Sequence, residues 1–306
     1  MSEVLQAVDL LPRAMRGTGT AATRRSVLPT KSVQTSREWL RLSRGLARFG
    51  RSQVVQTLQF LVFVALLAWI TVRGAEAMGY NWQWYRVPQY LYRVANGEIV
   101  WGPLVRGSIE TLKISAWSLV LTVAFGLTTA LLRMSRSVSG RLLARGYMEA
   151  IRNTPLLVQL NLFYFVIAPI FGIDRFWTGV LCLAVFEGAF ASEIFRAGIL
   201  AVHRGQWEAS FSLGLSRRDT YRYVVLPQAV SMMLPPLASL AISLVKHSAI
   251  VSVIALFELT TAGRDVISQT FMSFEIWFTV AGIYLLMTLL LSAMVSWFEH
   301  RAQLRR

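Results

Sequence analysis

Six apolar segments, each about as long as a membrane-spanning helix, restrict the fold of this chain more than any other feature. A helix of about 20 residues crosses the roughly 30 Å hydrocarbon core of a bilayer. Because lipid offers the backbone no hydrogen-bond partners, such segments fold as helices. The predicted spans are 54–72, 108–134, 155–172, 177–196, 235–256 and 276–298. The sequence therefore predicts an all-α integral membrane protein with about six transmembrane helices.

The positive charge of the chain lies mainly in the loops on one side of these spans. The 306 residues are 55% hydrophobic and still have a formal net charge of +15, unlike a soluble domain. Arg residues gather in the first 52 residues, after the second and fourth spans and at the C-terminal end. Because basic loops stay in the cytoplasm, we expect both termini to be cytoplasmic. This distribution favours a membrane protein over a nucleic-acid-binding protein, whose basic residues share one face.

The sequence divides into four parts. The first is a basic cytoplasmic tail, in which apolar residues from Trp39 to Phe49 recur at helical spacing, as in a helix that lies on membrane lipid. A solvated tail is the alternative. The second holds the first span and an aromatic outer segment, for which we expect a lid or short interfacial helices. The third is the main transmembrane domain and the fourth a short cytoplasmic tail. The parts are 1–52, 53–106, 107–299 and 300–306.

The polar loop 205–229, between the fourth and fifth spans, contains its own helix signals. Gly214 suits the left-handed end of a short helix. Ser216, with Asp219 three residues later, has the spacing of a capping box that starts a second helix. Pro227 lacks a backbone donor, so we expect it to end or bend that helix. The pattern predicts a helix-turn-helix beside the membrane, and an ordinary loop with a Gly turn is the alternative.

This loop resembles the EAA loop of the membrane subunits of ABC importers. That pattern is Glu-Ala-Ala, three residues, Gly, nine residues, Ile, one residue, Leu-Pro. The matching residues are Glu208, Ala209, Ser210, Gly214, Val224, Leu226 and Pro227, where Ser210 replaces Ala and Val224 replaces Ile. In that family the loop lies in a cleft of the cytoplasmic ATPase subunit. The resemblance implies that these residues couple the chain, through what we call the EAA-like loop, to an ATPase.

Two further segments narrow the resemblance to the polar amino acid permeases, the histidine, glutamine and glutamate type. Segment 152–159 is similar to their Arg-x-Thr-Pro-Leu-Leu-x-Gln signature, and 188–199 to their Gly-Ala-Tyr-x-x-Glu-Ile-x-Arg-x-Gly-Ile, with Phe190 for Tyr. The resemblance covers about residues 107–299 and implies the type I ABC importer transmembrane-subunit fold. In the fifth span Lys246 matches the branch, whereas His247 stands where Asp is common.

The resemblance implies a permease subunit that moves a polar amino acid across the bacterial inner membrane into the cytoplasm. Its implied partners are ABC ATPase subunits, an extracytoplasmic amino-acid-binding protein and a second permease subunit, the same or a sister chain. The sequence has no Gly-x-x-x-x-Gly-Lys-Ser/Thr motif, so we expect the partner to hydrolyse ATP and this chain to hold no cofactor, catalytic residue or metal. A secondary amino acid transporter is the alternative, although the halves show no internal repeat.

Charged residues within the predicted spans are candidates for the substrate path. An ionised group at the membrane centre costs about 2.5–3.5 kcal/mol on insertion scales, so it is usually paired or hydrated. Glu187 and Lys246 fall near the centre and could either meet the charges of a zwitterionic amino acid or form a permanent ion pair. Glu193 is weaker, because Arg196 is its natural local partner. The candidates are Glu187, Lys246, Gln159, Asn161 and Glu193.

Overall fold

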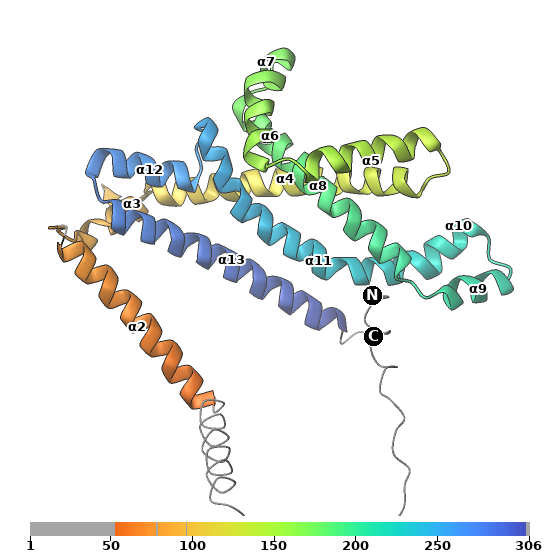
Figure 1. The fold of residues 1–306 in the computed structure, drawn as a ribbon, viewed down its shortest axis with the longest axis horizontal. Coiled ribbons are helices and arrows are strands. Elements are labelled where there is room, and N and C mark those ends of the chain that lie inside the picture. The colour runs from red at the N-terminus through yellow and green to blue at the C-terminus, as the bar shows by residue number, and fades with distance from the viewer. Residues whose placement is uncertain (1–52, 78, 96, 304–306) are drawn as a thin grey trace, which may run out of the picture. The chain divides into compact units, whose positions relative to one another are not determined.

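A computed structural model describes residues 53–77, 79–95 and 97–303 (Figure 1). Helices dominate this part of the chain, which confirms the all-α class. Contacts divide the chain into two units, one up to Asn81 and one from Trp82. The predicted helix in the tail 1–52 lies outside the described residues.

The first unit contains α2 (Gln53–Ala77), which includes the predicted first span. Its segment Val55–Gly74 is 20 residues long and apolar enough to cross a membrane. The large apolar side chains from Leu58 to Val72 are exposed around the whole helix. A helix that is apolar on all sides is typical of a segment surrounded by lipid.

In the second unit, three long helices contain the predicted second, fourth and sixth spans. They are α4 (Pro103–Met134), α8 (Arg175–Leu200) and α13 (Ser273–Gln303). Among the described residues, five helices are long and apolar enough to cross a membrane, or six if one bent pair counts as a single span. This count agrees with the predicted six.

The bent pair is the predicted third span together with the helix before it. α5 (Val138–Arg152) meets the segment 156–171 at an angle of 108°. That segment consists of α6 (Leu156–Leu162), a π turn (Phe163–Ile167) and α7 (Ala168–Phe171). From the sequence, Thr154 is expected to cap this helix, with Pro155 as its first residue. The structure differs, because the Thr154 hydroxyl donates to the Ala150 carbonyl at 2.8 Å and Pro155 occupies the N-cap position.

The fifth span begins earlier than predicted. α10 (Arg217–Asp219), a π turn (Thr220–Val225), α11 (Leu226–His247) and a 3-10 turn (Ser248–Ile254) form one 38-residue segment. The expected start at Pro235 and Pro236 is wrong, because both lie inside α11. Pro227 does not end the helix either. The π turn directly before it widens the hydrogen-bond ladder, so the chain continues despite the missing donor of Pro227.

The segment between the predicted fifth and sixth spans, which the sequence predicts to be an outer loop, is largely a helix, α12 (Leu259–Thr270). Glu258 caps it, since its carboxylate accepts the N–H groups of Thr260 and Thr261 at 2.8 and 2.7 Å. The same carboxylate is fully buried and accepts the hydroxyl of Tyr284 on α13 at 2.8 Å. Glu258 therefore joins α12 to α13, although the sequence alone predicts that it lies in a loop.

The aromatic outer segment is only partly as predicted. The short helices η1 (Trp84–Arg86) and α3 (Pro88–Leu91) are present, but they lead into an unpredicted antiparallel hairpin, β1 (Tyr92–Ala95) and β2 (Glu98–Trp101). The dipeptide Asn96-Gly97 between the strands is the signal that predicts such a hairpin. The backbone N–H of Gln83 donates to Glu275 of α13 at 2.6 Å, which fixes the start of the segment.

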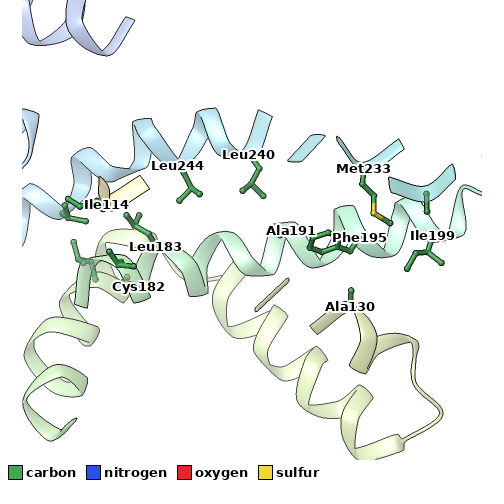
Figure 2. Close-up of a cluster of buried hydrophobic side chains, with 14 of the residues drawn as sticks. Ile114, Ala130, Cys182, Leu183, Ala191, Phe195, Ile199, Met233, Leu240 and Leu244 are labelled. Atoms are coloured by element: carbon green, nitrogen blue, oxygen red, sulfur yellow. The ribbon is translucent and has the colours of Figure 1, made fainter. Parts of the chain in front are cut away.

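The core of the second unit lies between α4, α8 and α11 (Figure 2). Leu240 and Leu244 of α11 face α8 in Figure 2, and Ala130 of α4 lies on the other side of α8. α4 and α8 approach closely at Gly126, where an added Cβ would lie 2.6 Å from that of Ala191. Small residues permit this approach between membrane helices. The packing holds α8 and α11, the two helices that flank the EAA-like loop, in fixed positions.

Candidate functional site: the EAA-like loop and the charged residues of the spans

The EAA-like loop has the turn that its sequence predicts. α9 (Arg204–Ser212) is followed by Gly214, whose φ of +75° is left-handed. The N–H groups of Gly214 and Leu215 donate to the carbonyls of Phe211 and Ser210 at 3.0 and 3.1 Å, which closes the helix end. Ser216 then caps α10, because its hydroxyl accepts the N–H of Asp219 at 3.2 Å. Both predicted helix signals are confirmed.

The inner side of the loop is packed. The ring of Trp207 on α9 lies edge-on to Tyr221 of the π turn, with centroids 5.0 Å apart. Ser210, which replaces the Ala of the pattern, is buried and donates to the Gln206 carbonyl at 2.6 Å. Because its hydroxyl has a partner within the same helix, Ser fits a position that otherwise suits Ala.

The outer side of the loop is exposed. Glu208 pairs with Arg204 at 3.0 Å, but both side chains are largely in solvent, so the pair adds little stability. Phe211 and Leu213 are also exposed, at 50% and 81%. Neither residue belongs to the EAA pattern, although two large apolar side chains in a polar loop are a signal for protein contact. Other exposed members of the pattern are Ala209, Gly214, Leu226 and Pro227.

Both ends of the loop continue into the core. Ile199 and Val202 at the end of α8, and Val225 and Ala229 at the start of α11, belong to the same buried cluster. The exposed loop is therefore anchored at both ends in the close-packed core that α8 and α11 share.

Glu187 on α8 is buried and contacts His247 of α11, with Oε1 and Nδ1 2.5 Å apart. The edge of the imidazole faces the ring of Phe186, with centroids 6.1 Å apart. Lys246 is exposed and absent from the salt bridges of the described residues. The ion pair considered between Glu187 and Lys246 is therefore replaced by a contact with the neighbouring histidine.

The remaining candidates do not join Glu187 in one cluster. The amide nitrogen of Gln159 donates to the Ile151 carbonyl at 2.8 Å and to the Thr154 hydroxyl at 2.7 Å, so it fastens the bend before α6. Asn161 donates to the Leu157 carbonyl of its own helix at 3.0 Å. Glu193 pairs at 2.7 Å with Arg152, not with the expected Arg196. Within the described residues, no three His, Cys, Asp or Glu side chains form a metal-binding group.

Comparison with known proteins identifies the family. Residues 122–304 match the model of the binding-protein-dependent transport system inner membrane component. The chain belongs to this family. The permease is 38% identical over 212 residues to the glutamine transport system permease protein of Escherichia coli K12, covering 67% of this chain and 96% of that relative. It is 35% identical over 204 residues to the L-cystine transport system permease protein of Bacillus subtilis 168, covering 66% and 87%.

Solved structures agree with this assignment. A crystal structure of an amino acid ABC transporter with histidines matches the permease with a TM-score of 0.62 and 43% identity, covering 65% of this chain and 94% of that one. The inward-facing MetNI methionine ABC transporter matches at 20% identity with a TM-score of 0.58, which shows the fold alone. The permease is an ABC importer membrane subunit with the type I fold, and a multi-pass inner-membrane protein.

Proposed function

We propose that the permease moves a polar amino acid into the cytoplasm and that separate ATPase subunits drive it through the EAA-like loop. The observation that carries this proposal is an exposed helix-turn-helix whose two ends are buried in the core at α8 and α11. Relatives named for glutamine and L-cystine transport support an amino acid as the substrate.

In this mechanism the ATPase binds the exposed side of the EAA-like loop. The apolar side chains of Phe211 and Leu213 would enter a cleft of the partner, and Glu208 and Ala209 would line the contact. Closure of the ATPase would move α9, and the contact of Trp207 with Tyr221 would carry that movement to α11. ATP would bind to the partner, so this chain would need no cofactor.

The other partners follow from the same proposal. An extracytoplasmic binding protein would deliver the amino acid, and a second permease subunit, the same chain or a sister chain, would complete the path. Glu187 and Lys246 would meet the ammonium and carboxylate groups of the substrate, with His247 as the resting partner of Glu187. Glu193 stays a weaker candidate, because it pairs with Arg152 at the end of α5. Gln159 and Asn161 would be polar neighbours of the path, although their amide groups donate to carbonyls of their own bend and helix.

Replacement of Gly214 by Val tests the coupling role. A β-branched residue strains the left-handed backbone of Gly214, so α9 is displaced from the ATPase. Gly146→Val is a matched control, because an added Cβ meets no atom within 4 Å at either position and Gly146 has an ordinary helical backbone. Both variants, reconstituted with the ATPase and binding protein, are compared in ATP-dependent uptake.

We expect Gly214→Val to insert normally but to lose most uptake and ATPase stimulation, while Gly146→Val keeps both. Uptake near the unmodified level in Gly214→Val would overturn the coupling role. Uptake driven by an ion gradient without the ATPase would instead indicate a secondary transporter.

A further inference from the structure

Among the described residues, the β1–β2 hairpin has one apolar face whose side chains are at least half exposed. Tyr92 lies opposite Trp101, and Val94 lies opposite Ile99. Because alternate residues of a strand point to the same side, these four side chains share one face. They are 50%, 54%, 69% and 62% exposed, respectively. The opposite face is mixed and carries Arg93, Ala95, Glu98 and Val100.

The hairpin is fastened to the beginning of a spanning helix. β2 ends at Trp101 and α4 begins at Pro103. Gly102 between them donates its N–H to the Leu91 carbonyl at 2.8 Å, and an added Cβ there would lie 2.1 Å from the Tyr90 carbonyl oxygen. The hairpin is therefore held within two residues of the start of α4, the helix that contains the predicted second span.

A second spanning helix begins near the same segment. The rings of Trp82 and Phe274 have centroids 5.7 Å apart, and those of Trp84 and Phe278 have centroids 6.4 Å apart. Both phenylalanines lie in the first two turns of α13, and Trp84 and Phe278 are about half exposed, at 46% and 52%. Exposed aromatic side chains thus occur where α4 and α13 both begin. Figure 1 shows α3 at this end of the two helices.

We propose that the apolar face of the hairpin lies in the lipid headgroup layer and anchors this end of the permease to the bilayer. Trp and Tyr are enriched at this level of membranes, because their rings are apolar and their polar groups remain hydrated. The hairpin directly precedes α4, whose first turns carry the charged Arg106, Glu110 and Lys113 before its uncharged apolar part, as expected of a helix that enters the membrane from the headgroup layer. Arg106 in the first turn of α4 is exposed and is available to lipid phosphates. This role is independent of which solute is transported.

Spin labels on the two faces of one strand test the proposal. The sequence has one cysteine, the buried Cys182, which is replaced by Ala to give a cysteine-free background. Single cysteines are then placed at Val94 on the apolar face or at Ala95 on the opposite face, its matched control. The labelled permease with its ATPase subunits is reconstituted in phosphatidylcholine and phosphatidylglycerol vesicles. Relaxation of each label is measured with lipid-soluble oxygen and with a water-soluble nickel chelate.

We expect the ratio of oxygen to nickel accessibility to be several-fold higher at Val94 than at Ala95. A second pair of labels, at Ile99 on the apolar face and Glu98 on the opposite face, repeats the comparison on β2. This pair is used instead if a label at Val94 or Ala95 prevents assembly of the transporter. Equal ratios on the two faces, or preferential access of nickel at Val94, would overturn the proposal. A label at Val94 shielded from both reagents would also overturn it, because a protein surface would then cover the face.

Discussion

Glu187 and His247 bring an acid and an imidazole together inside the membrane domain, between α8 and α11. An unpaired charge at this depth is expensive, so a buried carboxylate needs a hydrogen-bond partner or a substrate group. The histidine stands where related permeases commonly have Asp, and Glu187 supplies an acidic group from the neighbouring helix. We therefore expect this pair to affect which amino acids the permease accepts.

Replacement of Glu187 by Gln tests this role at the residue scale. Gln keeps a hydrogen-bonding group for His247 and removes the charge, so the fold is retained. Uptake is expected to fall by about tenfold or more, equivalent to about 1.4 kcal/mol, while ATPase stimulation persists. Lys246→Met is expected to act in the same way. Uptake and thermal stability are measured for both variants.

The exchanged double variant, Glu187→His with His247→Glu, is the control for a purely structural pair. Recovery of uptake in this variant would favour a structural contact. Unchanged uptake in both Glu187→Gln and Lys246→Met would remove the two residues from the substrate path.

The sequence predicts the depth of Glu187 in the membrane but not its partner. Depth in the membrane can be counted along the chain, because a helix rises about 1.5 Å per residue. The direction in which a side chain points around the helix axis cannot be predicted in this way, because successive side chains differ in direction by about 100°. Lys246 and His247 lie at nearly the same depth, but only His247 faces Glu187. This direction depends on the packing of α11 against α8.

At the scale of elements, the contact between α4 and α8 depends on small residues. Gly126→Ala is expected to destabilise the permease by about 1–3 kcal/mol, because the new Cβ would lie 2.6 Å from that of Ala191 and the helices would have to separate. Gly282→Ala is the matched control. No atom lies within 4 Å of an added Cβ at Gly282, so Ala there is expected to be neutral or stabilising. Thermal unfolding in detergent compares the two, and equal midpoints would contradict this account.

Elements with a strong apolar signal are predicted well, and those fixed by tertiary contacts are not. α4, α8 and α13 follow the apolar segments closely. Pro235 and Pro236 mislead because prolines are tolerated inside membrane helices, where neighbouring groups satisfy the freed carbonyls. α12 has a polar sequence, and the carboxylate of its cap Glu258 is buried against the Tyr284 hydroxyl of a helix that comes later in the chain.

At the scale of the whole molecule, the proposed function requires the EAA-like loop to face the cytoplasm. The Arg-rich tail and loops predict this orientation. A cytoplasmic reporter inserted near Arg24 and another fused after Arg306 are both expected to be active. Activity of an export-dependent reporter at the C-terminal end would contradict an even number of spans and would place the EAA-like loop away from the ATPase.

The contacts of α13 with the outer segment have a consequence for the order of synthesis. The bond from Gln83 to Glu275 joins residues 192 positions apart. At translation rates of roughly 5–20 residues per second, roughly 10–40 s pass between the synthesis of Gln83 and that of Glu275. During that interval Trp82 and Trp84 lack Phe274 and Phe278 as ring partners, and Glu258 emerges before its Tyr284 donor. α13, which is synthesised after α4, α8 and α11, therefore completes the segment that precedes α4.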